Sequence, residues 1–128
     1  MSALNFPHVM MSAQDAGATI RRVDSNTSAS TRELIAARGA NMRIGIISAI
    51  IANTGSTNNV LVTLKSGSTS IAHVYVPTET TAIASFGVDA PMWLNANEDL
   101  DWTTDAASTT VYITVHGLVG GNVNVVTA

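Results

Sequence analysis

Residues 60–76 read VLVTLKSGSTSIAHVYV, and this stretch decides the fold of the chain. Its apolar and polar residues follow a period of two, which is the pattern of a β-strand with one buried face. Ser66-Gly67-Ser68 interrupts the pattern, and glycine accepts a positive φ without strain. The stretch therefore predicts a hairpin of two antiparallel strands, 60–65 and 69–76, joined by a tight turn.

The period of two continues on both sides of this hairpin. Residues 43–52 form the most apolar stretch, and their isoleucines occupy both odd-numbered and even-numbered positions. We expect both faces of a strand there to be covered, one by the core and the other by a second sheet, the N-terminal arm or another subunit. In residues 109–116, Val111, Ile113 and Val115 alternate with polar residues, which predicts another strand.

The remaining segments are shorter. Further strands are predicted at 19–23, 81–86 and 99–103, and loops or turns at 24–31, 53–59, 77–80, 91–94 and 104–108. Residues 32–38 fit two helical turns or a strand, and we prefer the strand because everything after them reads as β. Gly117, Gly120 and Gly121 are expected to loosen the end of the last clear strand, and 123–126 to form an edge strand or a tail.

These segments predict a single domain. Residues 1–16 lack a stable period and are expected to be an extended arm, and residues 17–128 to be the domain. About seven to nine short strands, with turn signals roughly every ten residues, are typical of an antiparallel β-sandwich or jelly roll. The fold class is therefore all-β.

Composition excludes several classes of protein. The chain has 128 residues, 46% of them apolar and only 12% charged, with a net charge of −3. A disordered tail needs more charge, and a bulk nucleic-acid binder needs a basic surface. No apolar run is long enough to span a membrane, and the absence of cysteine excludes disulfides and thiolate chemistry. Charge is unevenly distributed: residues 1–65 are net positive and 66–128 net negative, which suits repeated protein contacts as well as ordinary solvation.

No motif predicts catalysis or a cofactor. Asn95, Asn97, Asp99 and Asp101 alternate and offer oxygen ligands for Ca²⁺, but the spacing is not that of an EF-hand, so solvation is the default interpretation. The late acidic residues do not predict a facing glycosidase pair, and the three histidines have no metal-ligand spacing. We expect no metal, no cofactor and no enzymatic activity; a small hydrolase is the last of three functional hypotheses.

Two tryptophans are the best candidates for a binding surface. Trp93 and Trp102 would form a subunit interface or an aromatic platform if they were exposed. Core packing is the first interpretation for both, because the chain has only six aromatic residues.

The order of strands and turns from 42 to 119 resembles a known group of proteins. The residues that carry the resemblance are Asn53-Thr54-Gly55, the segment 62–68, Pro77, Phe86-Gly87, Pro91-Met92-Trp93, the segment 97–100 and the strand 111–115. This pattern resembles small β-sandwich proteins encoded in the structural modules of tailed bacteriophages. Some of them are capsid decoration (cement) proteins that form trimers on the phage head.

The resemblance implies a structural virion protein that is made in the host cytoplasm and ends on the capsid surface. Its expected partners are the major capsid protein and further copies of itself, as a homotrimer, and neither nucleic acid nor a membrane. For attachment we favour the arm and the early basic residues, namely Phe6, Pro7, His8, Arg21, Arg22, Arg32 and Arg38. The alternative function is a carbohydrate- or receptor-binding β-sandwich of a tail or fibre appendage.

Overall fold

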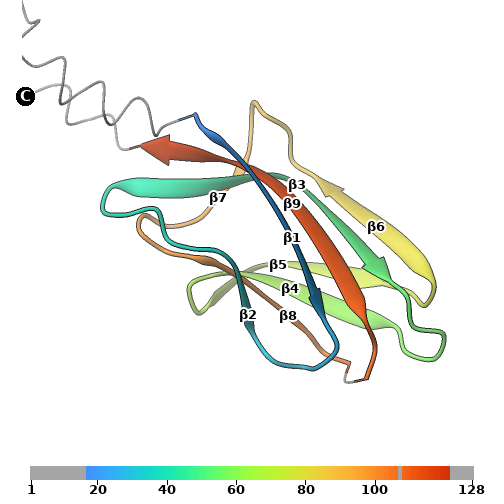
Figure 1. The fold of residues 1–128 in the computed structure, drawn as a ribbon. Helices are drawn as coiled ribbons and strands as arrows, with labels where there is room; N and C mark the ends of the chain where they lie inside the picture. The colour runs from blue at the N-terminus through green and yellow to red at the C-terminus, as the bar shows by residue number, and fades with distance from the viewer. Residues whose placement is uncertain (1–16, 107, 122–128) are drawn as a thin grey trace, which may run out of the picture.

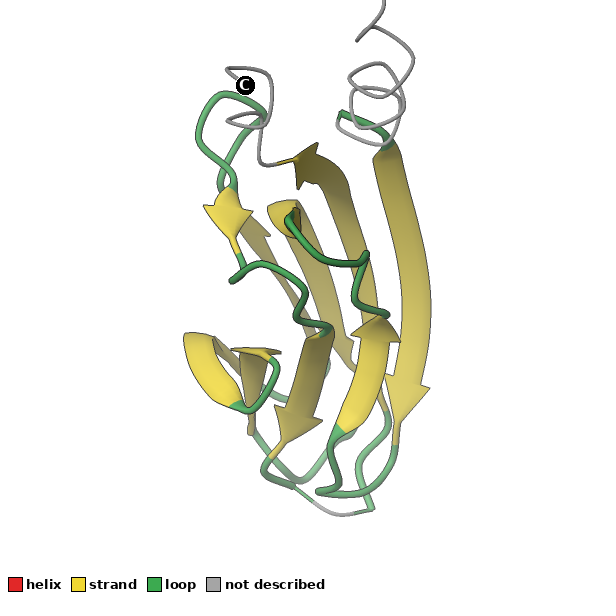
Figure 2. Ribbon diagram, turned by 90° about the vertical axis from the view of Figure 1, so that its left-hand side faces the viewer, coloured by secondary structure: helices red, strands yellow, loops and turns green. Residues whose placement is uncertain are grey.

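The computed structural model describes residues 17–106 and 108–121, which form an all-β sandwich. In this part of the chain there are nine strands and no helix, and all strand pairs are antiparallel. The two layers are plain in Figures 1 and 2. The prediction of an antiparallel β-sandwich is confirmed. No helix in the described residues has the length and apolarity to cross a membrane.

The first layer, sheet A, has its strands in the order β1-β9-β3-β6, with β7 also paired to β3. The bounds are β1 Thr19–Asn26, β3 Met42–Asn53, β6 Thr80–Ser85, β7 Met92–Trp93 and β9 Val111–Gly121. The long strands β3 and β9 lie side by side at its centre (Figure 1). They come from distant parts of the sequence, so the middle of the sheet depends on long-range pairing.

A β-bulge explains why isoleucine occurs on both parities of β3. Ile46 pairs with Gly117 and Ser48 with His116, so Ile47 is the extra residue. An extra residue reverses the side to which later side chains point. Isoleucines 44 and 46 before the bulge and Ile51 after it therefore all face the core, completely buried. Ile50 lies on the outer side of this strand and is exposed in the described residues, so a cover for this face by the arm or by another subunit stays a prediction.

The second layer, sheet B, contains the hairpin that the sequence predicts. Its order is β2-β8-β4-β5, with β2 Arg32–Ile35, β4 Val60–Ser66, β5 Thr69–Val76 and β8 Leu100–Thr104. The turn between β4 and β5 places Gly67 at a φ of 56°, as expected for a tight hairpin. The preference for a strand after residue 31 is confirmed for Arg32–Ile35, whereas 36–38 lie outside any strand.

Several predicted boundaries differ from the structure. The segment 24–31 is not all loop, because β1 continues to Asn26 through its pairing with Val111. The segment 91–94 contains the short strand β7, and β9 runs to Gly121 instead of loosening at Gly117. Pairing with β1 as far as Leu118 and with β3 as far as Gly121 holds this glycine-rich end in the sheet. The predicted arm, 1–16, and the segment 123–126 lie outside the described residues.

The inner faces of the two sheets form one apolar core. Its largest completely buried side chain is Trp102, on β8. The other large, fully buried members are isoleucine, leucine and valine side chains from both sheets and, with Leu94, from the loop after β7, namely Ile35, Ile44, Ile46, Val60, Val62, Leu64, Val76, Ile51, Leu94, Leu100 and Ile113. Burying apolar side chains of this size contributes about 1.5–3 kcal/mol each, so the core is the main source of stability.

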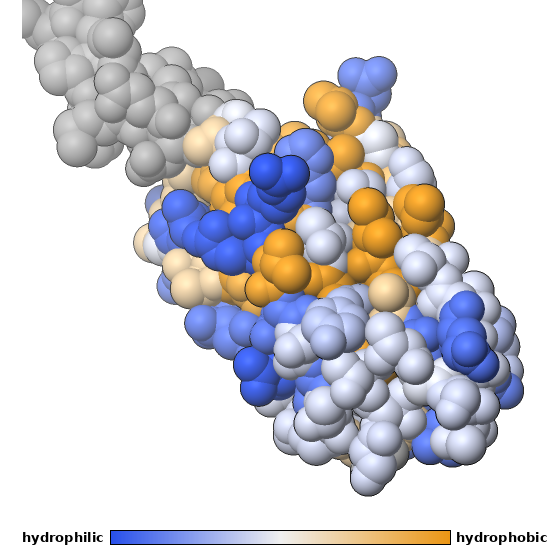
Figure 3. Space-filling model, turned by 45° about the vertical axis from the view of Figure 1, so that its right-hand side comes forward, coloured by the Kyte–Doolittle hydropathy of each residue, from blue (hydrophilic) through white to orange (hydrophobic). Residues whose placement is uncertain are grey.

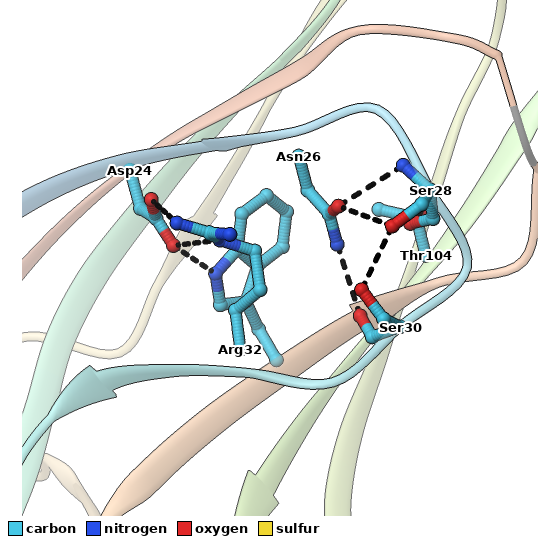
Figure 4. Close-up of polar contacts among 7 residues, drawn as sticks. Asp24, Asn26, Ser28, Ser30, Arg32 and Thr104 are labelled. Atoms are coloured by element: carbon cyan, nitrogen blue, oxygen red, sulfur yellow. Dashed lines mark hydrogen bonds and ion pairs between the residues drawn. The ribbon is translucent and has the colours of Figure 1, made fainter.

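One polar contact ties the two sheets together at this core. The carboxylate of Asp24, on β1, accepts a hydrogen bond of 2.9 Å from the buried Nε1 of Trp102. It also accepts two from the guanidinium of Arg32, on β2, at 2.9 and 3.0 Å. These bonds, led by those from Arg32, hold the pKa of Asp24 below its usual value. Figure 4 shows this cluster beside the network of Asn26, Ser28 and Ser30.

We expect substitutions of Asp24 to destabilise the sandwich in a graded way. Asp24→Ala leaves the indole N–H of Trp102 buried without an acceptor and is expected to cost about 2–4 kcal/mol. Asp24→Asn keeps an acceptor and loses only the ion pair, so about 1 kcal/mol is expected. Urea unfolding followed by tryptophan fluorescence measures both, with exposed Asp89→Ala as the control. Equal losses for the two Asp24 variants would contradict this role for the indole bond.

Candidate protein-interaction faces

The outer side of sheet A carries a row of apolar side chains that crosses the sheet. The register places Val23, Thr114, Ile50 and Ile83 opposite one another on β1, β9, β3 and β6. Val23 and Ile83 are each 69% exposed and Ile50 is 42% exposed. Tyr112 lies in the next row and is also exposed. Exposed apolar residues in contiguous positions are typical of a protein-interaction surface. We call this outer side face A; Figure 3 shows its apolar patch.

The charges of face A are all basic. Arg21 and His116 pair in the row next to the apolar one, and Arg43 lies further along β3. Among the described strands of sheet A, Asp24 is the only acidic residue, and it points toward Trp102 on the inner side. Face A therefore combines an apolar half with a positive half.

Trp93 lies at the positive half of face A because two glycines make room for its ring. A Cβ at Gly45 would come within 2.8 Å of the Trp93 ring, and one at Gly120 within 2.5 Å. The guanidinium of Arg43 lies 5.2 Å from the ring centroid, within the range of a cation–π contact. Trp93 remains 37% exposed. A role at an interface remains a prediction for this residue.

Trp102 cannot serve as an exposed platform or as a subunit-interface residue. Its side chain is completely buried, and its N–H is bound to Asp24 inside the sandwich. The prediction that it contributes to such a surface is wrong, and core packing is the correct interpretation. The physical reason is the alternation of β8, in which Leu100, Trp102 and Thr104 all face inward.

The outer side of sheet B, which we call face B, has a different pattern. Leu61 and Tyr75 pair at one end, and both are exposed. Thr63 and His73 form the next row, where the Thr63 hydroxyl and His73 Nδ1 lie 3.0 Å apart. At the other end of the face the register places Lys65 and Glu33 on either side of Asp101.

Three carboxylates crowd at this end of face B. Glu33, Asp99 and Asp101 each offer an oxygen within 4.8 Å of the others. Partial burial, followed by the hydrogen bond and negative charge of Asp99 and the charge of Glu33, raises the pKa of Asp101 to about 6, although Lys65 opposes the shift. The Oδ1 atom of Asp101 is buried and has no hydrogen-bond partner in the described residues. We call these residues the acidic cluster.

The acidic cluster differs from the set of Ca²⁺ ligands that the sequence pattern offered. Glu33 joins Asp99 and Asp101, whereas the alternating pattern pointed to Asn95 and Asn97. Three carboxylates suit a hard cation chemically, but Ca²⁺ takes six to eight oxygen ligands. Sequence could not reveal Glu33 because its approach to Asp101 depends on the pairing of β2 with β8, across 68 positions of sequence.

The residues predicted to attach the chain to a partner do not share one surface in the described part. Phe6, Pro7 and His8 lie outside the described residues. Arg21 lies on face A, Arg22 follows on the other side of β1, and Arg32 is engaged by Asp24. Arg38 lines a hollow of about 180 Å³ with Ala18, Ala37, Met42 and Val119. The prediction for these residues remains untested, and the exposed apolar row of face A was missed.

Comparison with known proteins identifies the fold. No protein-family model matches the chain, and no curated protein matches it by sequence. A chain in the acidic stable capsid structure of Helicobacter pylori bacteriophage KHP30 shares 8% identity at a TM-score of 0.56, over 80% of this chain and 89% of that one. At this identity the likeness shows the fold alone. This chain therefore has a fold that is used in a phage capsid.

Two further structures are similar at lower scores. The vertex protein P5 of PRD1 matches 80% of this chain and 97% of its own at a TM-score of 0.48 and 13% identity. The insecticidal delta-endotoxin Cry8Ea1 of Bacillus thuringiensis matches at a TM-score of 0.44 and 14% identity, over 75% of this chain and 19% of that one.

We expect Asp101 to make stability depend on pH. Its folded pKa of about 6 lies above the ordinary 3.8, so the folded chain holds this proton more tightly between the two values. The contribution of Asp101 to stability is then greatest below about pH 4 and falls as pH rises through about 6. Asp101→Asn should remove this fall and raise the free energy of unfolding at neutral pH by about 1 kcal/mol, discounted for solvent screening.

Urea titrations across this pH range, with Asp89→Asn as the matched control, measure the effect. An unchanged pH dependence in the Asp101→Asn variant would contradict the assignment.

Proposed function

We propose that this chain is a capsid decoration protein that binds the outside of a phage head as an oligomer and stabilises it. The observation that supports this most is face A, an exposed apolar row beside basic residues on a small sandwich. The fold that the chain shares with a KHP30 capsid chain, over most of both lengths, supports a structural role in a virion.

The proposed mechanism is multivalent binding. Each subunit would contribute a modest contact to the major capsid protein, and an oligomer, proposed to be a homotrimer, would bridge several capsid subunits at once. Linked contacts raise the effective concentration of each one, so the whole binds far more tightly than a single contact. Arg32 is already paired with Asp24, so Arg21, Arg22 and Arg38 are the better basic candidates, together with Phe6, Pro7 and His8 of the arm.

An appendage that binds carbohydrate or a receptor is the second candidate function. It depends on Trp93 alone, because Trp102 is buried. The exposed part of the Trp93 ring, beside Arg43, is the surface on which a sugar would stack. A tryptophan-fluorescence titration with host polysaccharide, repeated on Trp93→Ala, separates this function from capsid binding.

The decoration function predicts a head that is weaker without this chain. Deleting the gene from the phage that carries it should give particles that release DNA at a lower temperature, because the clamps between capsid subunits are lost. Adding the purified protein to these heads should restore both binding, measured by co-sedimentation, and heat resistance. Normal particles that lack the chain and show unchanged heat resistance would refute the proposal.

The arm gives a second test of attachment. A variant that lacks residues 1–16 is expected to lose binding to heads at least about tenfold, because contacts that order on the partner are removed. Circular dichroism and thermal unfolding show whether the sandwich remains folded. A folded variant that still binds with unchanged affinity would contradict the role of the arm.

A further inference from the structure

Both faces of the sandwich are divided into an apolar end and a charged end. On face A the apolar row and Tyr112 lie toward Asn53, and on face B Leu61 and Tyr75 lie toward Val76. A hydrogen bond of 3.1 Å from Asn53 Nδ2 to the carbonyl of Val76 joins these two ends across the sandwich. The apolar ends of the two faces therefore lie at the same end of the molecule.

The charged ends also coincide, but their signs are opposite. Leu94 N–H donates to the Ile44 carbonyl beside Arg43, and Asn95 N–H donates to Ser66 Oγ beside Lys65, so one short loop connects both charged ends. Face A carries Arg21 and Arg43 there, and Asp24, the one acidic residue of its described strands, points to the inner side. Face B carries the acidic cluster, and Lys65 lies beside it, opposite Asp101.

We propose that face A of one copy packs on face B of a second copy, in a head-to-tail contact. A second copy in the same orientation places apolar rows on apolar residues and arginines toward the acidic cluster. Bringing face A against another face A would instead oppose arginine to arginine or arginine to the apolar row, according to the direction of the two-fold axis, and both arrangements disfavour a symmetric contact. The charge complementarity therefore selects face B of another copy as the occupant of face A.

A head-to-tail contact has a structural consequence that a symmetric one lacks. The assembly keeps one free face A at one end and one free face B at the other, so copies can add until a rotation closes a ring, or a filament forms. The inference deepens the oligomeric part of the proposed function, yet it concerns the free protein and stands apart from attachment to a capsid. Arginines near the crowded carboxylates would also relieve their mutual repulsion.

Two single-face variants test the contact by light scattering after size exclusion over a range of concentrations. Ile83→Glu alters face A at a site that is 69% exposed, and Glu33→Lys alters face B at an exposed site. We expect the full chain to give multiples of its 13.3 kDa mass, and each variant to weaken association at least about tenfold. Arg21→Glu, also exposed, provides a second face A variant.

Mixing the variants is the decisive step. Ile83→Glu keeps a normal face B and Glu33→Lys keeps a normal face A, so together they can form one intact contact and no more. The mixture is expected to give a one-to-one dimer, whereas a mixture of Ile83→Glu with Arg21→Glu, both altered on face A, should remain monomeric. Added salt should weaken the native association, because its charged part is screened.

Matched controls show whether the effects belong to these faces. Val88→Glu changes an apolar residue that is 67% exposed on a loop, and Asp89→Lys reverses a charge beside it. Both variants should associate as the native chain does. A native chain that stays monomeric at every concentration, a Glu33→Lys variant that associates normally, or a mixture that forms no dimer would each overturn the proposal. Loss of capsid binding alone would refute only the proposed function.

Discussion

The carboxylate of Asp24 is the contact on which the closure of this sandwich depends. It joins β1 of one sheet to β2 and β8 of the other, through Arg32 and the buried N–H of Trp102. A buried indole needs an acceptor, and a carboxylate at the edge of a core needs a cation. Asp24 supplies the acceptor for the indole N–H, and Arg32 supplies the cation for Asp24. The largest core side chain is therefore buried without an unpaired polar atom.

Closure of the core also determines which side chains lie on the two outer faces. Successive side chains of a strand point to opposite faces of the sheet, so the residues between the core positions line up in rows on the outer face. The bulge at Ile47 places Ile44, Ile46 and Ile51 on the inner side of β3 and Ile50 on its outer side. The resulting outer faces each combine exposed apolar residues with charged ones.

Much of the fold could be predicted from local pattern. The hairpin of β4 and β5, the strand around Val111–Gly121 and the all-β class follow from a period of two and a glycine turn. The candidate faces could not be predicted, because each row draws residues from three or four strands. Glu33 and Asp101, or Val23 and Ile83, come together only through the register.

The sequence by itself determined an antiparallel sandwich, the uneven distribution of charge along the chain and the absence of cysteine chemistry. Only the pairing of distant strands determines which tryptophan is buried, which isoleucines are exposed and where opposite charges face outward. The physical reason is that an alternating apolar and polar pattern indicates only that neighbouring side chains point to opposite sides of a strand. Which side becomes the core, and which strands lie next to each other, depends on long-range pairing and on one extra residue at a bulge.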